Sequence, residues 1–298
     1  MTDHPTICRL RWGASRGLVA ALGALIALVA WAAPAAATPT GDFADFDRCP
    51  VDNLNATTCL YSEITSGSFV IGNGTVPIDK PIVLQGAYTI DGETGETTFF
   101  PARDGKTLSR TPLTVPGGLL GIADHSGFGG WLLQWFWDIV NTANAVTATA
   151  ELVGNVEFSF LNYMFGTGPA ITLPVRIKLD NPFLGTHCYI GSARTPITLA
   201  LTTGTTVPPA PNAPISGDRG AIDFAHGGDL ITATGTRLVD NAFAVPGASD
   251  CGPFGFRWLV NSAVNLKQGI PARAGRNTAV LEGTVKIASA AAVKASGA

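Results

Sequence analysis

Histidines limit the acid–base chemistry of this chain, because it contains only 4 of them. His125 lies in the tripeptide Asp124-His125-Ser126, beside glycines, where a hydrolase site is conceivable. The nucleophile elbow of such enzymes has the pattern G-x-S-x-G, because its strained turn leaves no room for side chains at the flanking positions. Asp124 and Phe128 occupy those positions here, so the motif is not formed. A secreted hydrolase that uses His125 or His226 stays open as an alternative.

Asp223, His226 and Asp229 follow one another at intervals of three residues. That spacing would gather metal ligands on one face of a helix, but Gly227 and Gly228 favour a loop. The sequence contains no H-E-x-x-H, no phosphate-binding glycine loop and no dinucleotide fingerprint. We therefore predict no bound metal, no cofactor and no catalytic residue. These absences favour a protein without enzymatic activity, but the sequence leaves that question open.

The first 37 residues predict a cleaved signal peptide. Arg9, Arg11 and Arg16 form a basic start, and the uncharged run Leu18–Ala33 follows it. The small residues of Ala35–Ala37 then suit a signal peptidase, so we place the cleavage after Ala37. The run is shorter than the ~20 apolar residues that span a bilayer. We expect a mature chain without a transmembrane span that is secreted, extracellular or associated with the cell envelope.

Cysteine usage agrees with export. Cys8 leaves with the leader, and four cysteines remain, an even number that indicates disulfides and allows three pairings. We prefer the pairs Cys49–Cys59, which closes a short polar loop, and Cys188–Cys251, which ties two strand-rich regions together. A zinc site is the rival interpretation, but no C-x-x-C pair is present.

Composition restricts the fold and the partners. The chain has 35 glycines and 20 prolines, and only 14% of its residues are charged, well below the ~25% of an ordinary soluble domain. These values argue against a helical bundle and a coiled coil. The net charge of −3 argues against binding to nucleic acid. We predict a single secreted β-rich domain over residues 38–288, followed by a frayed, alanine-rich tail at 289–298.

Apolar residues recur at every second position over much of the chain, which is the signature of half-buried strands. The clearest run is Ile171–Asp180, and Pro174 within it favours a sheet edge or a bulge. Residues 146–152 and 156–160 flank Gly154-Asn155 and predict a hairpin. Further strands are expected at Ser68–Ile71, Ile82–Ile90, Ile197–Thr202, Leu230–Val239, Ala242–Val245, Phe254–Val260 and Val280–Ile287. The fold expected is an all-β, antiparallel sandwich, similar to a jelly roll.

One segment departs from this pattern. Residues 130–145 predict a short, very apolar helix with a narrow polar edge. Such a helix could plug one end of the β core, or it could form a surface for a hydrophobic ligand, a lipid, the envelope or a protein partner, because clustered tryptophans are typical of such surfaces. Stacking of its aromatic rings on a sugar is the third interpretation. The candidate contact residues are Trp131, Trp135, Phe136 and Trp137.

Several runs resemble exported proteins of high-GC Gram-positive bacteria. They are LPVRIKLDNPFLGTHCYIGSARTPITLALTTGTTVPPAP, LVDNAFAVPGASDCG, LKQGIPARAGRNTAVLEGTV and the shorter PGGLLG. The resemblance implies export and places Cys188 and Cys251 in the shared region, and it brings no catalytic residue. We expect a non-enzymatic extracytoplasmic binding protein. The alternatives are the hydrolase named above and a structural component of the wall or surface.

Overall fold

A computed structural model describes residues 38–118 and 144–298, which belong to one compact unit. The predicted signal peptide lies outside the described residues. So do Trp131, Trp135, Phe136 and Trp137, together with most of the predicted helix at 130–145. Within the described part, strands dominate and the few helices are short. The prediction of an all-β chain is confirmed.

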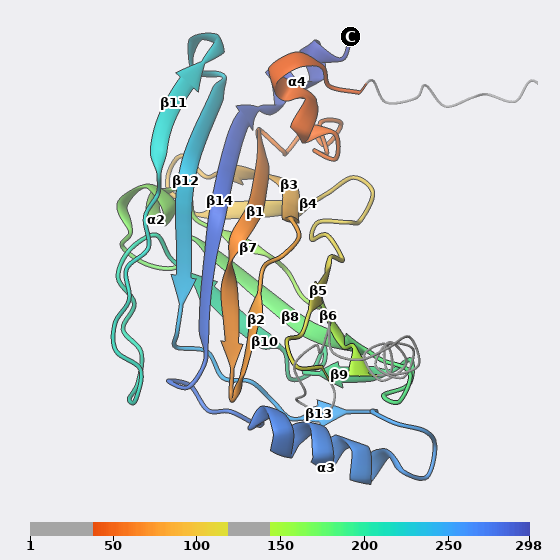
Figure 1. The fold of residues 1–298 in the computed structure, drawn as a ribbon. Helices are drawn as coiled ribbons and strands as arrows, with labels where there is room; N and C mark the ends of the chain where they lie inside the picture. Colours follow the sequence, from red (N-terminus) through yellow and green to blue (C-terminus); the bar gives the residue numbers. More distant parts are fainter. Residues whose placement is uncertain (1–37, 119–143) are drawn as a thin grey trace, which may run out of the picture. The chain divides into compact units, whose positions relative to one another are not determined.

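Two antiparallel sheets pack against each other (Figure 1). The strands of the first sheet, in chain order, are β1 (Thr58–Ile71), β2 (Gly74–Pro77), β3 (Ile82–Ile90), β4 (Thr97–Pro101), β11 (Ala221–Ala225), β12 (Leu230–Asp240) and β14 (Thr278–Ser289). Those of the second are β5 (Pro112–Thr114), β6 (Thr147–Leu152), β7 (Glu157–Phe158), β8 (Ile171–Asp180), β9 (Cys188–Ile190), β10 (Ile197–Leu201) and β13 (Ala248–Ser249). This arrangement is the β-sandwich that the alternation predicts.

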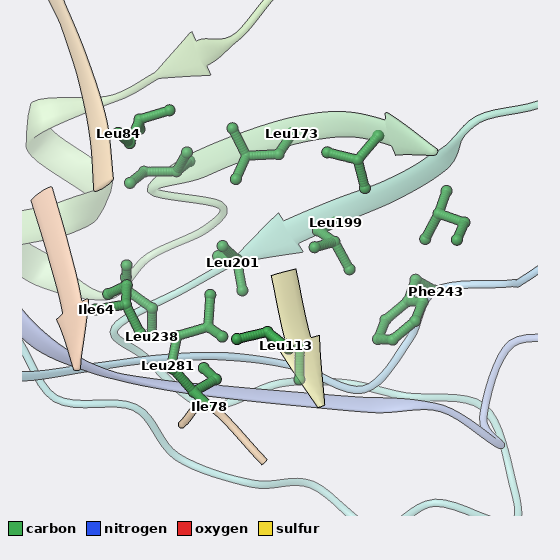
Figure 2. Close-up of a cluster of buried hydrophobic side chains, with 14 of the residues drawn as sticks. Ile64, Ile78, Leu84, Leu113, Leu173, Leu199, Leu201, Leu238, Phe243 and Leu281 are labelled. Carbon is green, nitrogen blue, oxygen red and sulfur yellow. The ribbon is translucent and has the colours of Figure 1, made fainter. Parts of the chain in front are cut away.

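The apolar side chains of the alternating strands point into the space between the two sheets. Ile64 of β1 and Leu281 of β14 point into it from the first sheet, and Leu173 of β8 and Leu199 of β10 point into it from the second (Figure 2). All four side chains are buried. Burial of apolar surface is the dominant favourable contribution to folding, so this shared layer holds the sandwich together.

The two sheets are also joined by backbone hydrogen bonds at one point. The amide of Thr202, just after β10, donates to the carbonyl of Val239 on β12 at 3.0 Å, and the amide of Val239 donates back at 2.9 Å. Backbone groups that pair in this way are not left unsatisfied at a sheet edge. The sandwich is therefore linked along one side.

The neighbours of β14 both change register at the same place. The ladder to β1 shifts between Ile64 and Ser66, and the ladder to β12 shifts between Thr234 and Thr236, each opposite Gly283. A Cβ atom at Gly283 would collide with a backbone carbonyl of β1. β-bulges bend a strand and increase its twist, so these shifts curve the first sheet over the second.

The predicted hairpin at 146–160 is wrong. β6 and β7 do not pair with each other, because both pair with β8, one after the other along the same side of it. The chain passes from β6 to β7 opposite Pro174, where Gly154 packs against the proline ring. Pro174 has no N–H to donate, so the gap between the two strands falls where β8 offers no donor.

The predicted strand at 254–260 is also wrong. Residues Arg257–Gln268 form helix α3, which ends at Gly269 with a left-handed φ of 66°. Val260, Val264 and Lys267 recur on one face of it with helical spacing. Two asparagines of α3 accept hydrogen bonds from the chain that precedes the helix. The backbone N–H of Cys251, in the loop before α3, donates to Asn261 at 2.9 Å, and that of Ala248, in β13, donates to Asn265 at 2.7 Å.

The C-terminal tail differs from the frayed segment that we expected. Residues Ala290–Ser296 form helix α4, and Val293 is fully buried within it. The partner is an N-terminal 3-10 helix, η1 (Gly41–Phe46), whose Phe46 belongs to the same apolar cluster. Lys294 also pairs with Asp52 at 2.8 Å. The tail is ordered because a segment distant in sequence covers it.

Two smaller helical elements complete the described chain. Helix α2 (Phe160–Phe165) begins at Ser159, whose side chain accepts a hydrogen bond from the backbone N–H of Asn162. Its Tyr163 is buried, and the Tyr163 hydroxyl lies 2.8 Å from the hydroxyl of Thr236 on β12. The 3-10 turn η2 (His226–Gly228) connects β11 to β12.

Both disulfides form with the pairing that we preferred. Cys49 bonds to Cys59 with their Cα atoms 5.7 Å apart, and Cys188 bonds to Cys251 with their Cα atoms 4.0 Å apart. The first bond fastens the η1 loop to β1. The second fastens the loop before α3 to β9, so it helps to hold α3 against the second sheet.

Replacing Cys188 and Cys251 together by serine is expected to lower the free energy of unfolding by about 4 kcal/mol, because the bonded residues are 63 positions apart. The same change at Cys49 and Cys59, which are 10 positions apart, is expected to cost about 3 kcal/mol. Chemical denaturation followed by circular dichroism measures both values. A larger loss for the Cys49–Cys59 pair would contradict the loop-closure explanation.

Candidate functional site

An apolar cavity of about 490 Å³ lies between the two sheets. This volume falls within the ~300–1,000 Å³ typical of ligand sites. Its walls come from β1, β2, β3 and β14 of the first sheet, from β5, β6, β8, β9 and β10 of the second, and from α3. Strand side chains that point between the sheets therefore surround a space that they do not fill.

Small side chains on β6 account for part of this space. Ala148 and Ala150 face the cavity, next to Leu179 and Ile177 of β8. Both alanines remain only partly buried although they point between the sheets, which is how residues beside a hollow behave. Protein interiors otherwise pack as densely as organic crystals, so an unfilled layer of this size is an unusual feature of the core.

The cavity has a mouth beside α3. Phe183, in the loop after β8, and Leu259 of α3 both line the cavity, yet they are 59% and 51% exposed. Ala263, one turn further along α3, also lines it and is exposed. Residues that belong to both the lining and the surface mark where the cavity meets solvent. A ligand would enter between α3 and the loop after β8.

Polar side chains are few in the lining that the structure describes, and they are Ser109, Thr111, Lys267 and Gln268. The Ser109 hydroxyl lies 2.9 Å from that of Thr111 and accepts a hydrogen bond of 2.9 Å from the N–H of Val83. Thr111 in turn donates to the carbonyl of Pro81 at 2.8 Å. Both hydroxyls are therefore engaged in holding the loop before β5 against β3.

Lys267 is the one charged side chain in the described lining. Its ammonium donates a hydrogen bond to the carbonyl oxygen of Gly118, and it forms no ion pair with any described carboxylate. Loss of hydration at the apolar wall lowers the pKa of Lys267 below the ordinary lysine value. The site thus combines a large apolar volume with a single uncompensated cation.

A second, smaller pocket of about 240 Å³ lies beside β9 and α3 and is polar. His187 lines it, but its two arginines already have partners. Arg176 lies over the ring of Tyr189 at 4.1 Å and contacts Glu151 at 2.7 Å, and Arg257 pairs with Asp250 at 3.0 Å. Because its charges are compensated internally, this pocket fits a structural network better than a ligand site.

The histidine motifs do not converge on a site within the described residues. His226 contacts Asp42 at 2.9 Å at the protein surface, and its ring lies 4.9 Å from that of Phe43. In residues 38–118 and 144–298, no group of three His, Cys, Asp or Glu side chains is placed to hold a metal ion. His125 lies outside the described residues.

Among the helices of residues 38–118 and 144–298, none has the length and apolar character to cross a membrane.

The cavity and Lys267 were not found from the sequence. One usable signal was present: Val260, Val264 and Lys267 follow the i, i+4, i+7 spacing of a helix face that is apolar apart from its lysine. A second was the pair of alanines at 148 and 150 in a strand whose inward positions are otherwise occupied by larger residues. Neither signal predicts that the helix with Lys267 and the strand with the two alanines line the same cavity.

The lowered pKa of Lys267 is directly measurable. After reductive methylation with a labelled methyl donor, the resonance of Lys267 is expected to titrate at a lower pH than free dimethyllysine, because the apolar wall disfavours the charged form. A Lys267→Gln variant, which lacks this resonance, assigns it. Titration at or above the pH of free dimethyllysine would contradict the lowered pKa.

Comparison with known proteins adds no functional label. No protein-family model matches the chain, and neither the curated proteins nor the solved structures give a match. The functional proposal below therefore rests on the residues that line the cavity.

Proposed function

We propose that this chain is a non-enzymatic, extracytoplasmic protein that binds an apolar ligand, a lipid acyl chain, in the cavity between its sheets. The observation that carries the proposal is a cavity of about 490 Å³ whose described lining is apolar at all but four side chains. Ligand sites are typically concave and mostly apolar, with a few polar groups that orient the ligand. This lining has that composition.

The size of the cavity fits a long chain. At about 30 Å³ for each water-sized group, a volume of about 490 Å³ accommodates on the order of 16 such groups. Each methylene that leaves water for an apolar site contributes about 0.8 kcal/mol. An acyl chain would therefore gain free energy in proportion to the length that enters, and it would bury lining side chains such as Ala148 and Ile177 that the empty protein leaves partly exposed.

The lining favours binding over hydrolysis. Ser109 and Thr111 are the hydroxyl side chains of the described lining, and no described His, Asp, Glu or Cys lines the cavity with them. Lys267, the one amine in the described lining, donates to the carbonyl of Gly118 and hydrogen-bonds to neither hydroxyl. A hydroxyl nucleophile needs an adjacent general base within hydrogen-bond reach. The hydrolase alternative therefore finds no support in this site.

Placement outside the cytoplasm is supported by covalent chemistry. The two disulfides, Cys49–Cys59 and Cys188–Cys251, are of the kind that persists in oxidising compartments. The leader-like composition of residues 1–37 points the same way. A protein exported beyond the membrane would meet lipids of the cell envelope, which is the source of ligand that we propose.

The test uses a neutral fluorescent apolar probe, N-phenyl-1-naphthylamine, titrated into the protein. We expect saturable enhancement of fluorescence at one site. Replacing Ala148 by Phe fills part of the cavity, so the affinity should fall about tenfold, equivalent to about 1.4 kcal/mol. The matched control is Thr198→Phe, which adds the same ring at an exposed position of β10, and it should bind as the wild type does.

Circular dichroism and thermal unfolding establish that the three proteins are folded. If the folded wild type does not enhance the fluorescence, or if Ala148→Phe and Thr198→Phe bind the probe equally well, the cavity is not a ligand site. Either result would remove the proposed function.

A further inference from the structure

We infer that the ligand is a long-chain fatty acid whose carboxylate is bound by the ammonium of Lys267 while its chain occupies the cavity. This inference rests on the proposed function and adds the chemical class of the head group. Three features carry it: the position of Lys267 in the lining, the absence of an anionic partner among the described residues, and the donors that remain available beside it.

Helix α3 fixes the position of the cation. Val260, Val264 and Lys267 lie on the face that lines the cavity, and Val264 is buried there. The hydrogen bond from Lys267 to the carbonyl of Gly118 holds the ammonium between α3 and the segment that follows β5. Asn261 and Asn265 fasten α3 to the preceding loop and to β13. The cation is thus held in place rather than free to extend into solvent.

Lys267 lacks the carboxylate partner that three other lysines of the described chain have, whereas Lys80 and Lys106, which also lack one, are exposed to solvent. Lys178 lies 2.5 Å from Asp180, and Lys286 lies 2.6 Å from Asp45. Lys294 of α4 lies 2.8 Å from Asp52. Lys267 has only a neutral carbonyl for a partner. A charge that loses hydration at an apolar wall is unfavourable unless an opposite charge accompanies it. An anionic ligand would supply that charge.

The remaining donors suit a carboxylate. A lysine ammonium has three N–H groups, and Gly118 accepts from one of them. The two N–H groups that remain on the ammonium match the two oxygens of a singly charged carboxylate. A phosphate carries more charge and more acceptor oxygens than this small set of donors satisfies.

The position of Lys267 is also consistent with the direction of entry. Leu259 and Ala263 of the same helix lie at the mouth of the cavity, and Ala263 is one helical turn from Lys267. A fatty acid would therefore enter with its methyl end first and keep its carboxylate beside α3. The apolar chain would then extend between the two sheets, over the inner face of β6 and β8, where Ala148 and Ile177 line the cavity.

The experiment compares two ligands with the same chain, hexadecanoate and the neutral hexadecan-1-ol, each displacing N-phenyl-1-naphthylamine. The wild type is expected to bind hexadecanoate about tenfold more tightly than the alcohol. Lys267→Met keeps the length of the side chain and removes its charge, so this preference should disappear while the affinity for the alcohol is retained. Lys80→Met is the matched control, because Lys80 also donates to a backbone carbonyl, that of Pro112, but does not line the cavity.

The outcomes separate this inference from the proposed function. If the wild type and Lys267→Met bind both ligands and show the same ratio of affinities, the carboxylate assignment is wrong and the acyl-binding function stands. If a lysophosphatidate with the same chain binds more tightly than hexadecanoate and depends on Lys267, the head group is a phosphate and the inference is overturned. If no ligand displaces the probe, the proposed function fails as well.

Discussion

The antiparallel ladder between β1 and β14 joins strands from opposite ends of the described chain, and both apolar layers of the protein depend on it. On one face, Ile64 and Leu281 contribute to the layer shared with the second sheet. On the other face, Cys59 and Ala288 lie opposite each other in the cluster beneath α4. Because successive side chains of a strand point to opposite faces, one register sets both layers. A slip by one residue would exchange them.

The curvature that the ladders impose on the first sheet is compatible with a hollow core. Both neighbours of β14 bulge opposite Gly283. In the second sheet, the residues that β6 contributes to the cavity lining are two small ones, Ala148 and Ala150. An unfilled apolar space forgoes the dispersion contacts that a packed core makes. The apolar ligand that we propose would restore those contacts. The disulfide Cys188–Cys251 and the asparagines of α3 then hold the one charged wall residue, Lys267, at the edge of that space.

The sequence predicted a strand's bounds correctly where the alternation of apolar and polar residues within that strand reflects which face is buried. Ile171–Asp180 and Ile82–Ile90 have the predicted bounds, because alternation is local and needs no knowledge of partners. The sequence predicted wrongly where the structure of a segment depends on which other segment packs or pairs with it. Residues 146–152 and 156–160 look like a hairpin around Gly154-Asn155, yet both pair with β8, because a turn signal does not specify which strand lies alongside. Residues 254–260 are rich in aromatic residues, which favour strands, but α3 begins at Arg257, and its face with Val260 and Val264 packs against the cavity.

By itself the sequence determined the alternation and the composition of an all-β chain, since both depend on residue types and short spacings. It limited the four cysteines that follow the predicted leader to three pairings, and the structure selected the pairing that we preferred. Only the tertiary structure decided that the inward faces enclose an unfilled volume and that Lys267 belongs to its wall. Whether a layer of side chains is filled depends on the distance between two sheets and on which residues face each other across it. Those quantities arise from contacts between strands far apart in the chain, and no local pattern encodes them.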